Sequence, residues 1–206
     1  MHSGRLNRMS GERRRRLVDV AAAEFASAGY REASLNRIIA KCGMSKSSFY
    51  YVIESKDELF EFVMAELLGG LANAVEIPEP EKFRGPDYWP RVEAFFAHLV
   101  TVSQREESAL TLGRMFYSDA PGGDASAGML AAVRQWVEEV LRVGRSCGAV
   151  RADLPEALQC SVVLRILQVF DEWTVAHFDE VGPENLDGLA AAQFATVRRV
   201  LESSAC

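Results

Sequence analysis

The chain has 206 residues, of which 49% are apolar and 25% charged, a composition typical of a globular protein with one or two small domains. No apolar run approaches the roughly 20 residues of a membrane span, and no apolar stretch follows the basic start as in a secretory signal, so we expect a cytoplasmic protein without a membrane partner. Four widely separated cysteines form no C-x-x-C pair, so we expect neither a metal site nor a cofactor.

Helical periodicity runs through the first quarter of the chain. Leu17, Ala21 and Phe25 recur at helical spacing, which predicts a first helix over 13–28 that ends at Gly29. Ser34 is placed to cap a short second helix, and Ser45 opens a third, over about 45–51. We expect the third helix to expose its polar residues.

The rest of the chain is also predicted to be helical, which makes the fold all-α with about nine helices. A capping box, Ser55 to Glu58, starts a long fourth helix, and the prolines and glycine of 77–90 form a loop. The five later helices are expected over 89–104, 106–117, 124–147, 155–178 and 183–201, with Pro155 placed early in its helix. We assign 1–12 to a flexible basic arm and divide the rest of the chain into two helical domains, 13–55 and 56–206.

The segment around Gly43 has the features of a helix-turn-helix. Two short helices meet at this glycine, which takes a positive φ without steric cost. Ile38, Met44, Phe49 and Val52 are spaced to lock the pair at a steep angle, so that the second helix projects into a DNA major groove. A helix of about 10 Å reaches only a few base pairs, so a specific site requires two copies and hence a homodimer.

The charge distribution agrees with this interpretation. Residues 1–50 hold ten Lys/Arg against four Asp/Glu and carry +6, whereas the remainder carries −12. A basic end on an acidic body favours contact of that end with double-stranded DNA. We expect Arg13 to Arg16 to precede the first helix and Lys56 to meet a phosphate at the start of the fourth. The predicted DNA-binding residues are Arg13, Arg14, Arg15, Arg16, Ser34, Lys46, Ser47, Ser48, Tyr50, Tyr51 and Lys56.

These residues resemble the tetracycline-repressor (TetR) family over about 13–60. The family pattern is a basic start, F-x-x-x-G-[YF], [ST]-[LV]-x-x-I, A-G-V-S-[KR]-G-[TS]-[LF]-Y and K-x-x-L. It matches Phe25 to Tyr30, Ser34-Leu35, Ile38, Gly43 to Tyr50 and Lys56 to Leu59. Ser47 replaces the usual Gly, and Ile53 the usual Phe.

The resemblance implies a one-component transcriptional regulator, most simply a repressor, that binds a palindromic operator. It also implies that 13–55 is the helix-turn-helix DNA-binding domain and that 56–206 is a ligand-binding and dimerisation domain. The dimer would form through the last two helices (about 155–204), and a small apolar or amphipathic ligand would release the protein from DNA. Control by a protein partner without a ligand stays open as an alternative. No catalytic residues are expected, because the chain lacks the G-x-S-x-G, H-E-x-x-H, P-loop and dinucleotide-binding patterns.

A ligand pocket in the second domain would be apolar with a few polar groups. The predicted lining residues are Phe95, Phe96, His98, Leu99, Met115, Phe116, Trp136, Arg165, Phe170, Trp173 and His177. Aromatic residues at helical spacing also serve simply as core, and an arginine in an apolar stretch often extends its head to water. Whether Arg165 or the histidines line a pocket therefore stays open.

Overall fold

The computed structural model describes residues 9–120 and 123–203. Over these residues the chain forms ten α-helices, and its only β contact is an isolated bridge between Val150 and Glu202. The helices are α2 (Gly11–Glu32), α3 (Leu35–Cys42), α4 (Lys46–Val52), α5 (Lys56–Ala74), α6 (Tyr88–Arg105), α7 (Glu107–Phe116), α8 (Asp124–Ser146), α9 (Glu156–Ala176), α10 (Phe178–Val181) and α11 (Leu186–Leu201). The remaining elements are two 3-10 turns, η1 (Pro80–Phe83) and η2 (Pro183–Asn185). The all-α prediction is confirmed, and no described helix is long and apolar enough to cross a membrane.

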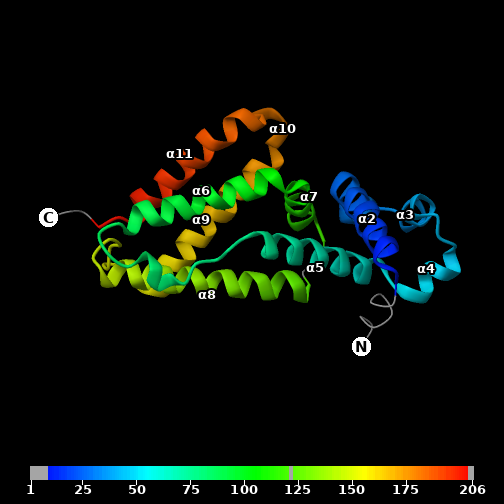
Figure 1. Cartoon of the computed structure of the whole chain (residues 1–206), viewed down its shortest axis with the longest axis horizontal. Helices are drawn as coiled ribbons and strands as arrows, with labels where there is room; N and C mark the ends of the chain where they lie inside the picture. The colour runs from blue at the N-terminus through cyan, green and yellow to red at the C-terminus, as the bar shows by residue number, and fades with distance from the viewer. Residues whose placement is uncertain (1–8, 121–122, 204–206) are drawn as a thin grey trace. The chain divides into compact units, whose positions relative to one another are not determined.

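The chain divides into two compact units. The first comprises Met1–Ala72 and Ser108–Ala127, and the second comprises Asn73–Glu107 and Gly128–Cys206. Figure 1 shows α2, α3 and α4 of the first unit in blue to cyan. The functional boundary predicted after residue 55 stays a prediction, because compactness reports packing rather than function. The predicted arm, 1–12, lies largely outside the described residues.

The first unit is built around one face of α2. Leu17, Ala21 and Phe25, four residues apart, are fully buried, as expected for the core stripe of an amphipathic helix. The Phe25 ring meets Phe60 of α5 edge-to-face, with centroids 5.1 Å apart. Tyr30 meets the same Phe60 ring at 5.3 Å. These aromatic contacts join α2 to α5 and leave the opposite side of α2 free for polar residues.

The start of α2 differs from the prediction. The helix begins at Gly11, so Arg13 to Arg16 lie inside its first two turns and do not precede it. Arginine is a good helix former, and nothing between Gly11 and Leu17 stops the helix. At the predicted end, Gly29 interrupts the helical dihedrals with φ 73° and ψ 164°, but a further turn continues the element to Glu32. The four arginines are therefore displayed around a helix.

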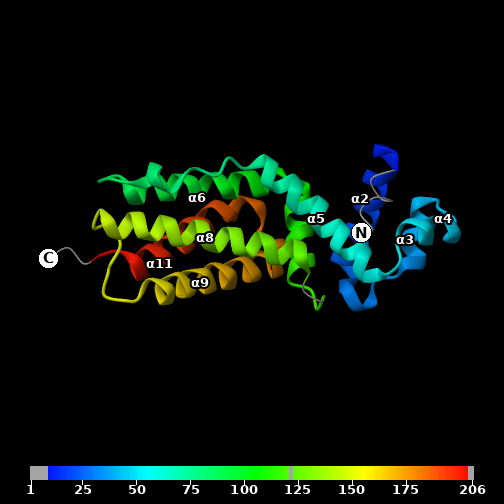
Figure 2. The same cartoon turned by 90° about the horizontal axis from the view of Figure 1, so that it is seen from below.

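The second unit is a bundle in which α11 packs against α6 and α9. The four long helices α6, α8, α9 and α11 run alongside one another in Figure 2. Trp89 of α6, Cys160 and Val163 of α9, and Phe194 of α11 share one buried apolar cluster. The buried Tyr88 hydroxyl donates to the Val140 carbonyl at 3.1 Å, and burial raises the pKa of this phenol.

Three boundaries in the second unit also differ from the prediction. The helix expected to reach about residue 178 ends at Ala176, and the separate short helix α10 accounts for the tenth helix. Pro155 lies at the N-cap of α9 rather than inside it. The last helix begins at Leu186, after η2, because Gly182 takes φ 74° and the 3-10 turn follows it.

Candidate nucleic-acid interface

The turn between α3 and α4 is shaped by local hydrogen bonds. The Ser34 side chain accepts the Arg37 backbone N–H at the start of α3, and the Ser45 side chain accepts the Ser48 N–H at the start of α4. Between them Gly43 takes φ 66° and ψ 29°. Its N–H and that of Met44 donate to the carbonyls that end α3, each at 3.1 Å, which is the Schellman arrangement. The predicted turn at Gly43 and both serine caps are confirmed.

We expect Gly43→Ala to destabilise the protein by about 1 kcal/mol, because an L side chain is disfavoured in left-handed backbone. A Cβ at this position meets no atom within 4 Å, so the cost comes from the backbone alone. Gly70→Ala, at an equally open position inside α5, is the matched control and should stabilise by about 0.5–1 kcal/mol. Urea midpoints of the two variants should move in opposite directions; a Gly43→Ala midpoint at or above wild type contradicts the prediction.

Two buried side chains anchor α4. Phe49 and Ile53 are both fully buried, so Ile53 fills the core position where the family pattern usually has Phe. The opposite face is polar: Lys46, Ser47 and Ser48 are exposed. This short helix is therefore fixed from one side by the core and presents a hydroxyl- and ammonium-bearing surface on the other.

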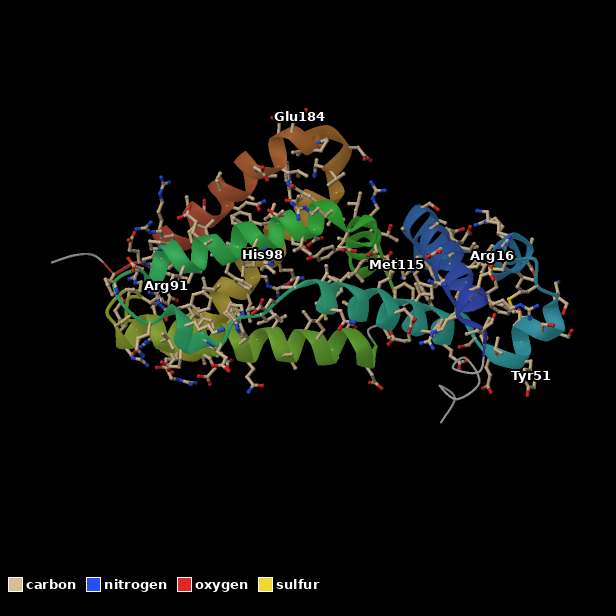
Figure 3. All side chains as sticks on the ribbon, in the orientation of Figure 1. Arg16, Tyr51, Arg91, His98, Met115 and Glu184 are labelled. Atoms are coloured by element: carbon tan, nitrogen blue, oxygen red, sulfur yellow. The ribbon has the colours of Figure 1, made fainter. Side chains whose placement is uncertain are left out.

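The hydroxyls of α4 form a small network at its first turn. The Ser45 hydroxyl lies 2.8 Å from the Ser48 hydroxyl and 3.0 Å from that of Ser47. Two tyrosines follow one turn later, Tyr50 with 48% and Tyr51 with 64% of its surface exposed. Figure 3 shows Tyr51 projecting from α4. Such hydroxyls both donate and accept, as contacts to phosphates and base edges require.

A surface hollow of about 870 Å³ lies beside α4. Its lining residues are Met9, Ser10, Arg13, Arg16, Cys42, Gly43, Met44, Ser45, Ser47, Ser48, Tyr51 and Val52. Arg13 and Arg16 come from the first turns of α2, so arginines of α2 line the same hollow as the hydroxyl-bearing residues of α4. Burial raises the pKa of the Cys42 thiol, although Arg16 opposes this, so the thiol stays neutral. The charge of the hollow is positive, which suits a polyanion.

The structure therefore brings together some of the predicted DNA-binding residues. Arg13, Arg16, Ser47, Ser48 and Tyr51 line one hollow. The hollow also contains side chains that were not predicted, among them those at positions 9, 10 and 42. Positions 9 and 10 belong to it because the start of α2 lies close to α4, which no local sequence pattern predicts, whereas Cys42 is the last residue of α3.

Other predicted contacts point elsewhere. Arg14 donates through Nε to Glu66 of α5 at 3.1 Å and lies 5.3 Å from the centre of the Phe62 ring. The Lys56 ammonium donates to the Arg31 carbonyl at 2.8 Å. Arg16, although it lines the hollow, donates to a backbone carbonyl at the end of α3 at 3.0 Å. Contact of any of these groups with DNA stays a prediction.

The comparisons with known proteins converge on one family. Residues 17–63 match the sequence model of bacterial regulatory proteins of the tetR family. An uncharacterized HTH-type transcriptional regulator of Bacillus subtilis, YdgC, is 39% identical over 49 residues, 24% of this chain and only 25% of that protein. The first part of the chain is therefore similar to the N-terminal segment of TetR-family regulators. Proteins of this family are DNA-binding regulators and not enzymes.

Solved structures of TetR regulators share the fold along nearly the whole chain. NalD of Pseudomonas aeruginosa, the secondary repressor of a multidrug efflux pump, aligns with a TM-score of 0.68 at 14% identity, over 94% of this chain and 98% of that one. The ketosteroid regulator KstR2 of Mycobacterium tuberculosis aligns with a TM-score of 0.65 at 20% identity, over 95% and 98%. At these identities the likeness shows the fold, a helix-turn-helix domain followed by a helical domain.

The predicted ligand-pocket residues are scattered over both units. Met115 and Phe116 belong to the first unit, and the other nine to the second. Four aromatic side chains, Phe95, Phe96, Trp136 and Phe170, pack against the apolar cluster of the second unit. Leu99 is half-buried, whereas His98, Arg165 and Trp173 are exposed. Most of the set thus serves as core or surface.

Neither described hollow is lined by these residues. The second one, of about 200 Å³, lies at Glu138, Leu141, Arg142, Glu156 and Ala157. The exposed Arg165 guanidinium donates to Gln168 at 2.9 Å, and the His177 ring stacks on Trp173 at 4.4 Å. Within the described residues, no group of three His, Cys, Asp or Glu side chains is arranged to hold a metal ion.

Proposed function

We propose that this chain is a one-component repressor of the TetR family that binds a palindromic operator as a homodimer in the cytoplasm. The observation that supports it is the exposed polar face of α4, flanked by the hollow into which Arg13 and Arg16 turn. The hydroxyls of Ser47, Ser48 and Tyr51 supply donors and acceptors for base edges and phosphates. The two arginines supply the charge that holds the phosphate backbone.

The length of α4 makes a dimer necessary for a specific site. Its seven residues, Lys46–Val52, span about 10 Å at 1.5 Å per residue. A helix of this length reaches only a few base pairs, each contributing about 1–3 kcal/mol of discrimination. Two copies on a twofold-symmetric site double the number of base pairs read, so we expect half-sites about one helical turn of DNA apart.

An exposed apolar stripe on α9 is the proposed dimer interface, with a second copy of the chain as its occupant. Leu158, Val169 and Trp173 are 49%, 55% and 46% exposed. They fall on one side of the helix at spacings of eleven and four residues, close to whole helical turns. Large side chains exposed along one stripe are typical of association surfaces. The neighbouring helix α11, which packs on α9, would complete an isologous contact.

Release from DNA by a small apolar or amphipathic ligand in the second unit is part of the proposal. Binding of that ligand would change the separation of the two α4 helices and so oppose DNA binding reciprocally. One observation favours the alternative, a regulator controlled by a protein partner: the aromatic residues predicted to line a pocket pack against the core. If a library of apolar small molecules displaces no bound DNA at saturation, control by a protein partner is favoured over control by a ligand.

Selection of duplexes from a random-sequence library tests the proposed function. We expect the full-length protein to enrich an inverted repeat whose halves are centred about 10 base pairs apart. Enrichment of a single unrepeated half-site, or of nothing, would count against a dimeric operator-binding regulator. The enriched duplex then serves as the probe for the variants described below.

We expect Lys46→Ala to weaken binding to this duplex and to random duplexes alike. The Lys46 ammonium is exposed at the start of α4, where it can neutralise one phosphate. Loss of that contact should reduce the slope of log K against log salt by about 0.9. Fluorescence anisotropy between 50 and 300 mM KCl measures the slope. Lys82→Ala, an exposed lysine in the second unit, is the control and should leave the slope unchanged.

A further inference from the structure

A buried carboxylate holds both basic side chains of α3. Glu24 lies in the middle of α2 and is only 4% exposed. Its Oε1 accepts the Ser34 backbone N–H at 3.0 Å and the Arg37 Nε at 2.6 Å. Its Oε2 lies 3.9 Å from the Lys41 ammonium. The hydrogen bond from Arg37 lowers the pKa of this carboxyl despite its burial, so it is ionised at neutral pH.

The guanidinium of Arg37 is held on more than one side. Its Nη2 lies 2.5 Å from the Glu24 carboxylate and donates to the Glu32 backbone carbonyl at 3.0 Å. Both cations are nevertheless near the surface, with 54% of the Arg37 side chain and 61% of the Lys41 side chain exposed. Both cations are therefore accessible to solvent, whereas the Glu24 carboxylate that they pair with is buried.

Transfer of Arg37 to a DNA phosphate would break these bonds and leave a buried carboxylate without its partner, an arrangement that strongly destabilises proteins. Lys41, at a longer distance from the carboxylate, is restrained more weakly. Contacts between cations and phosphates raise affinity for every sequence equally and carry no discrimination. A cation kept from phosphate thus lowers affinity for the operator and for random DNA by the same factor, while the base-reading contacts of α4 are unaffected.

We propose that Glu24 is a positioning residue that limits the sequence-independent affinity for DNA by withholding Arg37, and to a lesser degree Lys41, from the DNA backbone. Its bond to the Ser34 N–H fixes the start of α3 at the same time. The inference rests on the proposed function, since it concerns the same DNA-binding surface. It adds that the positive charge of α3 is internally neutralised by Glu24, and that this neutralisation lowers affinity for DNA of any sequence.

Glu24→Gln tests the proposal, because the amide keeps the shape and can still accept the Ser34 N–H while the charge is removed. Anisotropy titrations of the full-length protein with a random-sequence duplex, between 50 and 300 mM KCl, give the salt slope. We expect the slope to steepen by about 0.9 for each released cation. Affinity at 50 mM should then rise about tenfold for random DNA and for the enriched duplex alike, so that the preference between the two stays unchanged.

Two further variants separate charge release from a purely structural role. Arg37→Gln, with Glu24 intact, should leave the slope on random DNA nearly unchanged, because Arg37 does not contact phosphate in the wild type. The double variant Glu24→Gln/Arg37→Gln should lose the part of the increase in salt slope that Arg37 contributes in Glu24→Gln. A Glu24→Gln slope that is equal to or lower than wild type overturns the proposal, as does a decrease of about 0.9 in Arg37→Gln alone.

These results are distinguishable from a failure of the proposed function. If the wild-type protein binds no duplex in a salt-dependent way, the chain does not act on DNA, and both the proposed function and the role assigned to Glu24 are wrong. If the wild type binds and enriches a repeat while the Glu24→Gln slope stays the same, only the role assigned to Glu24 is wrong. Thermal unfolding of each variant shows whether the bond to Ser34 also stabilises the first unit.

Discussion

We expect Val169→Glu to convert a dimeric protein into monomers of 22.8 kDa. The Val169 side chain is 55% exposed in the single chain, so a carboxylate there stays hydrated until a second copy covers it. Burying one unpaired charge costs roughly 3–5 kcal/mol, which corresponds to a factor of at least 10² in the dimer dissociation constant. In an isologous interface the substitution occurs in both subunits, so two unpaired carboxylates are buried for each dimer formed.

Loss of the dimer should also remove operator binding. A monomer presents one α4 helix and cannot contact two half-sites at once, so its affinity should fall toward that for random DNA, typically a loss of 10³-fold or more. Light scattering after gel filtration measures the mass, and anisotropy with the enriched duplex measures the affinity.

Leu130→Glu provides a matched control for this experiment. Leu130 is 53% exposed but lies on α8, outside the two helices proposed to form the interface. We expect this variant to remain a dimer and to bind the enriched duplex as the wild type does. A Val169→Glu protein that also stays dimeric at micromolar concentration would refute the α9 interface.

The parts of the site that were predicted correctly are those determined by neighbours in sequence. Gly43 signals a left-handed turn because no other residue enters that conformation without cost. Ser34 and Ser45 signal helix starts because their hydroxyls reach a backbone N–H three residues on, as observed. The helix-turn-helix and the exposed face of α4 follow from these local signals together with the burial of Phe49.

The parts that were missed depend on residues far apart in sequence. Arg14 reaches Glu66, 52 positions away, and no spacing rule predicts that pair. The lining of the hollow depends on the approach of the start of α2 to α4. The ion pair of Glu24 with Arg37 joins two different helices across a turn, so helical periodicity within either one does not reveal it.

The ends of helices were predicted well only where the chain contains a strong stop. Gly43 marks an end that the structure shows, and Gly29 interrupts the helical dihedrals of α2. The end of α9 has no such signal: its capping position is His177, whose N–H donates to the Trp173 carbonyl at 3.0 Å, and the first glycine follows five residues later. The start of α2 was misplaced for the same reason, since its N-cap, Ser10, makes no side-chain capping hydrogen bond.

We expect Phe49→Ala to abolish DNA binding by releasing α4 from the first unit. Phe49 is fully buried, and removing a buried phenyl group costs about 3–5 kcal/mol, a large share of the stability of a typical domain. A helix of seven residues is too short to persist without its anchor. Tyr50→Ala, at the adjacent and 48% exposed position, is the control and should change stability by less than about 0.5 kcal/mol. Circular dichroism melts and binding to the enriched duplex measure both effects.

Because Phe49 lies in the first unit and the proposed interface in the second, the Phe49→Ala protein should remain dimeric by light scattering. A Phe49→Ala variant that binds the enriched duplex with wild-type affinity would mean that α4 does not carry recognition.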